Sequence, residues 1–181
     1  MLELIVYACP TGELATALDN YFRLANANFG GNPAHNYMPH ITLTSFFEIP
    51  PEQLEAYKTY LTDAFTAHQP TPTPILQVMG LVLRPEFHGL EVRAPHLKII
   101  AADFVTRATN TTKDTAKNTT PDINLKDWLH LSLAYGFSAK HDPGLRQLAK
   151  FTVDPNASAS WSLRLYERHA QGWTKRIDLP L

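Results

Sequence analysis

The spacing of apolar residues changes repeatedly along the chain between a helical and an extended pattern. Apolar residues three and four positions apart predict amphipathic helices, whereas short apolar runs closed by proline or glycine predict strands. Helices are expected at residues 13–26, 52–67, 96–107 and 143–150. Strands are expected at 2–8, 37–49 and 128–137, with hairpins formed by 75–83 and 90–93 and by 161–167 and 173–179.

This order of elements predicts an α+β fold. We expect one bilobal, pseudo-duplicated domain over residues 1–181, in which two antiparallel sheets line a central cleft and the helices lie outside. Pro70, Pro72 and Pro74 predict a stiff connector. Residues 108–122 are rich in Thr and Asn without apolar periodicity and predict a mobile loop. A surface insertion is the favoured interpretation of this loop, and a segment flanking the cleft is the alternative.

Composition narrows the class of protein. The chain has 181 residues, of which 44% are hydrophobic and 18% charged, and a formal net charge of −1. This charge argues against a protein that holds long nucleic acid by its phosphates, but it leaves small phosphate esters open. The single cysteine, Cys9, excludes an intrachain disulfide and is expected to be buried. No signal peptide or membrane span is evident, so we expect a cytoplasmic monomer without membrane contact.

One pattern, His-apolar-hydroxyl-apolar, occurs twice, beginning at His40 and at His130. Side chains two positions apart share one face of a strand, so His40 should lie beside Thr42 and His130 beside Ser132. The copies are separated by about half the chain, which predicts two equivalent strands facing each other across the cleft. A single strand histidine is more often structural than catalytic, but the repetition of the whole pattern favours catalysis.

The four side chains are sufficient to cleave a phosphodiester. One imidazole can activate water while the other protonates the departing oxygen, and the hydroxyls can bind the non-bridging oxygens. Two histidines of ordinary pKa predict a bell-shaped pH profile with a maximum near neutrality. Neither motif contains a charged residue, which suits a singly charged diester better than a monoester. No third ligand stands at metal-binding spacing on either strand, so no metal or other cofactor is expected.

With both motifs, the sequence resembles the 2H phosphoesterase superfamily, the LigT-like fold, and most closely its plant and fungal cyclic nucleotide phosphodiesterases. The likeness rests on residues 37–43 and 129–135 and extends over most of the chain. It implies a bilobal fold without a metal and hydrolysis of 2′,3′-cyclic nucleotides to the 2′-phosphate. It also implies activity on ADP-ribose 1″,2″-cyclic phosphate.

Carried over by position, the resemblance makes His40 and His130 the acid and base. It makes Thr42 and Ser132 the phosphate ligands, and it matches Tyr135 to a tyrosine beside the phosphate. Strict alternation places Tyr135 on the face opposite His130, so it reaches the site only if the strand twists or bulges after Ala134. Two features depart from that branch: Leu129 stands where proline is frequent, and the loop over 108–122 is longer than expected.

Two alternatives remain open beside a small cyclic phosphate as the substrate. One is a 2′,5′-oligonucleotide or RNA-end phosphodiesterase of the same superfamily, which needs a basic track leading from the cleft. Lys113, Lys117 and Lys126 are the only lysines or arginines between residues 108 and 128, so support for that track is thin. The other is a nucleotide- or RNA-binding module without turnover.

Overall fold

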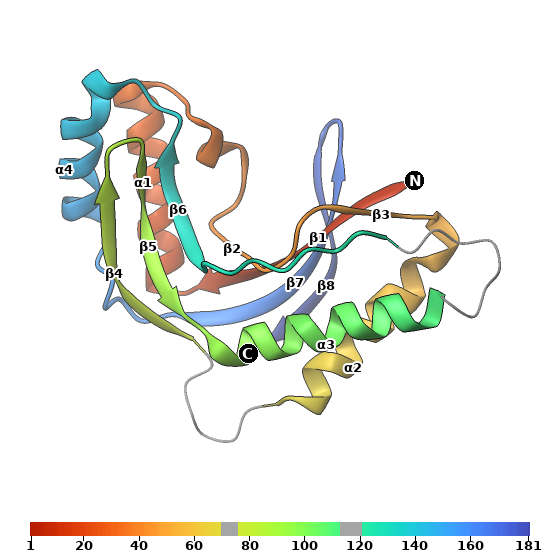
Figure 1. Cartoon of the computed structure of the whole chain (residues 1–181). Coiled ribbons are helices and arrows are strands. Elements are labelled where there is room, and N and C mark those ends of the chain that lie inside the picture. Colours follow the sequence, from red (N-terminus) through yellow and green to blue (C-terminus); the bar gives the residue numbers. More distant parts are fainter. Residues whose placement is uncertain (70–75, 113–120) are drawn as a thin grey trace.

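The computed structural model describes residues 1–69, 76–112 and 121–181 and forms an α+β fold within them (Figure 1). Its helices are α1 (Glu13–Phe29), α2 (Leu54–Ala67), α3 (Pro95–Thr112) and α4 (Asp142–Thr152). Its strands are β1 (Leu2–Thr11), β2 (Ile41–Thr42), β3 (Phe47–Ile49), β4 (Gln77–Arg84), β5 (Phe87–Arg93), β6 (His130–Tyr135), β7 (Ser160–His169) and β8 (Gly172–Pro180). The predicted α+β class is confirmed.

The strands of the described residues form one antiparallel sheet in the order β4-β5-β6-β2-β1-β7-β8, with β3 paired to β1. The expected pair of separate sheets is therefore wrong. The join is made by β2, which pairs with β1 on one side and with β6 on the other. Because β2 supplies hydrogen-bond partners to both neighbours, the two halves of the chain share one ladder. The predicted internal duplication is not confirmed, since the first motif strand has two residues and the second has six.

The helices cover one face of this sheet. In Figure 1, α1 and α4 lie together beside β4, β5 and β6, while α2 and α3 lie together at the other end. Leu4, Val6 and Ala8 of β1 join the core cluster to which all four helices contribute. The intervening side chains of β1 include Tyr7 and Cys9, which is buried as expected, and they form a smaller cluster on the opposite face. That opposite face is where the pocket lies.

Helix α1 illustrates how the apolar spacing becomes packing. Its buried residues lie three or four positions apart and form one continuous stripe. The helix continues three residues beyond the expected end and stops at Gly30. That glycine has a φ of 80°, and its N–H donates to the Asn26 carbonyl. Glycine adopts this left-handed conformation without steric cost, so it ends the helix. The buried residues of α1 are Leu14, Leu18, Tyr21 and Ala25.

The first motif strand, expected over 37–49, is interrupted after Thr42. Between the pairs that join β1 to β2 and to β3, two residues of β1 face four residues, 43–46. A regular ladder cannot absorb two extra residues, so the chain bulges there. The Thr44 hydroxyl accepts a hydrogen bond from the Val6 N–H at 3.1 Å and takes the place of a backbone partner. The bulged segment also pairs with residues 124–126, an arrangement we call the clasp.

The loop predicted over 108–122 is wrong in its first part, because α3 continues to Thr112. Ala108 is fully buried against the core, and the Thr109 hydroxyl donates to the Val105 carbonyl one turn earlier, so the helix has no reason to end at Arg107. Residues 113–120 lie outside the described residues, as does the connector with Pro70, Pro72 and Pro74. Within the described ranges, no helix has the length and apolar character needed to cross a membrane.

Candidate active site

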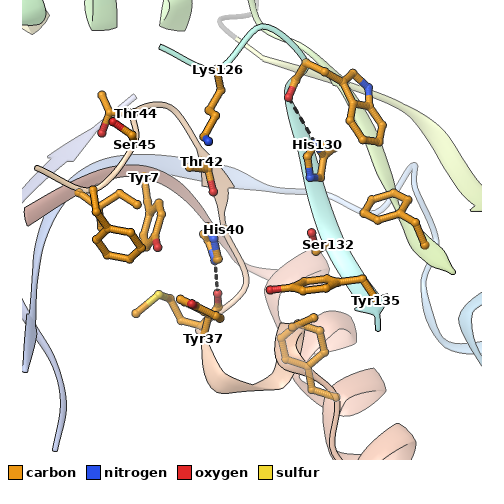
Figure 2. Close-up of a pocket in the computed structure, with 17 residues that line it drawn as sticks. Tyr7, Tyr37, His40, Thr42, Thr44, Ser45, Lys126, His130, Ser132 and Tyr135 are labelled. Carbon is orange, nitrogen blue, oxygen red and sulfur yellow. Dashed lines mark hydrogen bonds between the residues drawn. The ribbon is translucent and has the colours of Figure 1, made fainter. Parts of the chain in front are cut away.

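A pocket of about 610 Å³ opens on the face of the sheet that carries Tyr7. Its wall brings together all five residues predicted from the sequence: His40, Thr42, His130, Ser132 and Tyr135 (Figure 2). Most of the remaining wall is apolar or aromatic. That part of the wall consists of Ile5, Tyr7, Phe22, Ala34, Tyr37, Met38, Phe46, Phe87 and Trp128.

The two motifs are neighbours in the sheet rather than opposite walls of a cleft. Ile41 of β2 pairs with Leu131 of β6, and both side chains are buried in the core below. Continuing this antiparallel register by one residue in each direction sets Thr42 opposite His130 and His40 opposite Ser132. The two histidines therefore occupy one diagonal of a square and the two hydroxyls the other.

This crossed arrangement spaces the imidazoles for chemistry on a group between them. Diagonal neighbours on adjacent strands are separated by about 7–8 Å, compared with about 5 Å for directly opposite residues. A phosphate seated in the square would meet one imidazole on each side and one hydroxyl at each remaining corner. In Figure 2, His40 lies just before β2 near Thr42, and His130 lies on β6 near Ser132.

Both imidazoles are held in the same way by their own chain. His40 Nδ1 donates to the Met38 carbonyl at 2.7 Å, and His130 Nδ1 donates to the Trp128 carbonyl at 3.3 Å. A carbonyl oxygen only accepts, so Nδ1 carries a hydrogen in both rings. Nε2 of each ring is therefore the atom that gains or loses a proton.

Aromatic rings fix the orientation of each imidazole but bury the two unequally. The His40 ring packs on Tyr7 with centroids 3.9 Å apart and contacts Tyr37 at 5.5 Å. The His130 ring stacks on Trp128 at 4.0 Å, while the edge of Phe87 approaches it at 5.2 Å. Trp128 is 41% exposed whereas Tyr7 is 1% exposed, so the surroundings of His40 are the drier of the two.

Burial lowers both histidine pKa values. It lowers the pKa of His40 to about 4, against a smaller opposing effect of the hydrogen bond to Met38, and the charge of His130 lowers it further. Burial also lowers the pKa of His130, with a further lowering from the positive charge of Lys126. Because His40 is the more deeply buried, it is the one more readily kept neutral in the free protein, and a proton is retained more readily by the more accessible His130.

Tyr135 reaches the pocket because β6 contains a bulge. His88 of β5 pairs with Ala134, and the next residue, Gly89, pairs with Ser132, so Leu133 is an extra residue on β6. Leu133 and Ala134 are both fully buried, and alternation resumes with Tyr135 on the pocket side. The expected condition for Tyr135 to reach the site is met, with the irregularity at Leu133 rather than after Ala134.

Comparison with known families agrees with this geometry. Residues 9–74 match the family described as LigT-like phosphoesterase. Over these residues the chain is similar to LigT-like phosphoesterases, which belong to the 2H phosphoesterase superfamily. The matched residues include the first motif, and the second motif, outside them, completes the same pocket.

Longer proteins contain regions similar to this chain. It is 30% identical over 206 residues to ecdysteroid-phosphate phosphatase of Drosophila melanogaster, covering 97% of the chain and 27% of that protein. It is 34% identical over 173 residues to the Bombyx mori protein of that name, covering 92% and 24%. It is 32% identical over 172 residues to ubiquitin-associated and SH3 domain-containing protein B of Homo sapiens, covering 92% and 25%. The chain spans about a quarter of the length of these curated relatives.

These relatives correct the expected place of the domain within the superfamily. They are insect and human proteins, so the assignment to the plant and fungal branch is wrong. The paired motif is common to the superfamily and does not distinguish its branches. The choice of the 2′-phosphate as product rested on that branch and loses its support.

Sequence reasoning did not assign Lys126 to the site. Lys126 lines the pocket because the clasp sets residues 124–126 beside the first motif: its N–H donates to the Leu43 carbonyl at 3.1 Å. The aromatic residues Tyr7, Phe87 and Trp128 were also not assigned. Position relative to the second motif was the available signal, since Trp128 and Lys126 precede His130 by two and four residues.

The lowered pKa values of His40 and His130 shift the expected pH optimum of the domain to acidic pH. In the free protein His40 must be neutral, which requires a pH above about 4, and His130 must be protonated, which requires a pH below its lowered pKa. The pH dependence of kcat/KM should therefore be bell-shaped with its maximum between about 4 and 6.5, rather than near neutrality. Steady-state kinetics across roughly pH 3.5–9 at constant ionic strength measure both limbs. A flat profile would contradict an acid–base pair of histidines.

Proposed function

We propose that the domain hydrolyses cyclic phosphodiesters of ribose, such as 2′,3′-cyclic nucleotides, by metal-independent acid–base catalysis. The proposal rests on the square formed by His40, Thr42, His130 and Ser132 at the neighbouring segments β2 and β6. An in-line displacement needs a base and an acid on opposite sides of phosphorus and donors toward the equatorial oxygens. The square supplies a group at each of these positions.

The reaction begins at His40. Its neutral Nε2 accepts a proton from water as the water oxygen bonds to phosphorus. The ribose oxygen on the opposite side leaves and takes the proton from Nε2 of His130. One P–O bond forms and one breaks, and the product is a phosphate monoester with a free hydroxyl. His40 then loses its proton and His130 regains one through solvent.

The hydroxyls act on the charge that develops during displacement. Thr42 and Ser132 lie at the two corners not occupied by histidine, where they can donate to the non-bridging oxygens. Tyr135 lies on the same wall, and burial raises the pKa of its phenol, so it stays protonated and can donate as well. Within the described residues, no three His, Cys, Asp or Glu side chains are grouped to hold a metal ion. All these roles are filled by side chains of the pocket.

Hydrolysis of a phosphate monoester is the second candidate. The name of the insect relatives records a phosphatase, and such a substrate carries a second negative charge. The chain corresponds to about a quarter of each of those proteins. The phosphatase activity in their name can therefore belong to the other three quarters. The pocket has one lysine and no arginine among its lining residues, which favours the singly charged diester.

A panel of substrates tests the proposal. It contains the four 2′,3′-cyclic nucleotides, ADP-ribose 1″,2″-cyclic phosphate, a 2′,5′-linked trinucleotide and 2′-AMP and 3′-AMP as monoesters. Each is incubated with and without EDTA. We expect turnover of cyclic phosphates that is unchanged by EDTA. The product should be a single monoester isomer, because the attacking water, phosphorus and the leaving oxygen must lie on the one line between the two histidines. Chromatography identifies which ribose oxygen leaves.

Other outcomes of the panel reassign the function. Hydrolysis confined to the trinucleotide would favour the oligonucleotide phosphodiesterase, and release of inorganic phosphate would favour the phosphatase. Activity lost with EDTA and restored by a divalent ion would overturn the metal-independent mechanism. Binding of a cyclic nucleotide without any product would favour a nucleotide-binding module.

A further inference from the structure

Lys126 brings a full positive charge to a pocket whose other lining residues carry no fixed charge. The remaining lining residues include no Lys, Arg, Asp or Glu within the described chain. Figure 2 shows the Lys126 side chain directed into the pocket, with its ammonium end toward Thr42. This charge therefore stands beside the square of histidines and hydroxyls.

The clasp holds the backbone of Lys126 in register with the first motif. The Lys126 N–H bonds the carbonyl of Leu43, the residue that follows Thr42. Two residues earlier, Asn124 and Ser45 bond each other twice: the Ser45 N–H donates to the Asn124 carbonyl at 2.7 Å, and the Asn124 N–H donates to Ser45 Oγ at 2.9 Å. Although Lys126 precedes the second motif in sequence, its position is set by the first.

No carboxylate of the described residues forms an ion pair with Lys126, unlike two other lysines of the chain. Lys58 pairs with Glu55, and Lys175 pairs with Asp178. The charge of Lys126 instead acts on His130, whose pKa it helps to lower. A cation that faces an apolar pocket without a carboxylate is arranged to receive an anion from solvent.

We infer that Lys126 binds the substrate phosphate and selects singly charged phosphodiesters. This inference rests on the proposed function and specifies its substrate class. The ammonium group of Lys126 matches the one negative charge of a diester, while the protonated His130 faces the departing oxygen. A monoester would bring a second negative charge into an apolar pocket that has no second lysine or arginine among its described lining residues.

Three variants test the role of Lys126. Lys126→Met removes the charge and keeps the length of the side chain, Lys126→Arg keeps the charge, and Lys150→Met removes a charge from α4, outside the pocket. For 2′,3′-cyclic AMP, Lys126→Met should lower kcat/KM by roughly 10- to 100-fold, mainly through KM, as expected for loss of a hydrogen bond to a charged group. Lys126→Arg should recover most of it, and Lys150→Met should match the parent protein.

The pH profile distinguishes this role of Lys126 from a purely structural one. Without the positive charge, the pKa of His130 should rise, and the alkaline limb of kcat/KM should move to higher pH in Lys126→Met alone. The other titratable groups facing His130 or adjoining Lys126 are the same in all variants. They are Tyr7, Tyr37, His40, Glu91, Asp127, Tyr135 and Arg84, whose guanidinium lies over the Trp128 ring.

Calorimetry separates failure of this inference from failure of the proposed function. If the parent protein turns over 2′,3′-cyclic AMP and Lys126→Met does so equally well with an unmoved alkaline limb, Lys126 does not bind the phosphate. If there is no turnover, titration with 2′,3′-cyclic AMP decides. Weaker binding by Lys126→Met retains the assignment and rejects hydrolysis, whereas equal binding or no binding overturns the assignment.

Discussion

Alanine in place of either His40 or His130 is expected to lower kcat for a 2′,3′-cyclic nucleotide by about 10²-fold or more. Each substitution removes one of the two groups that move protons in the displacement. Because both groups act in the same transition state, kcat of the double variant should be little lower than kcat of the less active single variant. Steady-state kinetics on folded protein, checked by circular dichroism and thermal unfolding, measure the effect.

His96→Ala provides the matched control for these variants. His96 lies on α3 and does not line the pocket, so its removal should leave kcat unchanged. A folded His40→Ala or His130→Ala protein with kcat within a few-fold of the parent value would exclude the two-histidine mechanism. The roles of Thr42 and Ser132, which depend on a phosphate held between the imidazoles, would fall with it.

Gly89→Ala is expected to damage both stability and catalysis, although the residue carries no chemistry. Gly89 of β5 lies opposite Ser132, and a Cβ there would stand 2.6 Å from the Leu131 carbonyl oxygen and 2.7 Å from the Phe87 ring. The carbonyl belongs to the backbone between His130 and Ser132, so it cannot move without moving the second motif. We expect a loss of about 1–3 kcal/mol in the free energy of unfolding, as for overpacked sites, together with a fall in kcat.

Gly31→Ala is the control for the Gly89 variant. A Cβ at Gly31 would approach only the side-chain amide of Asn26, at 3.2 Å, and that side chain can give way. Urea unfolding gives the stability of both variants, and kinetics on the same samples give kcat. A Gly89→Ala protein as stable and as active as Gly31→Ala would show that the sheet tolerates displacement at the second motif.

The helices and four of the site residues could be predicted because their signals are local. Apolar residues of α1 recur every three or four positions, and packing on the sheet uses the stripe that this spacing creates. His40 with Thr42 and His130 with Ser132 each lie within three residues of sequence. The repeated pattern indicated that both pairs belong to one site, although it did not predict that their segments are neighbours in the sheet.

The rest depends on contacts between distant segments that no local pattern contains. The break in the first motif strand follows from the bond between Thr44 and Val6, 38 residues apart. The entry of Lys126 into the pocket follows from the pairing of Ser45 with Asn124, 79 residues apart. The single sheet forms because β2 pairs on both sides, and nothing in the sequence of its two residues predicts this pairing. Alternation alone assigned Tyr135 to the wrong face, since nothing in the sequence of β6 marks Leu133 as the extra residue.

The extra residue Leu133 changes which positions of β6 face the pocket. Residues before it present even positions to the pocket, and residues after it present odd ones. Deleting Leu133 would make Ala134 the residue after Ser132, so plain alternation would keep Ala134 in the core and Tyr135 in the pocket. The bulge thus gives Tyr135 the same face as a strand one residue shorter, whereas a regular strand of the present length would turn its hydroxyl to the core. In an evolving gene, gain of this single codon could lengthen β6 without removing the phenol from this wall, with no amino acid substituted.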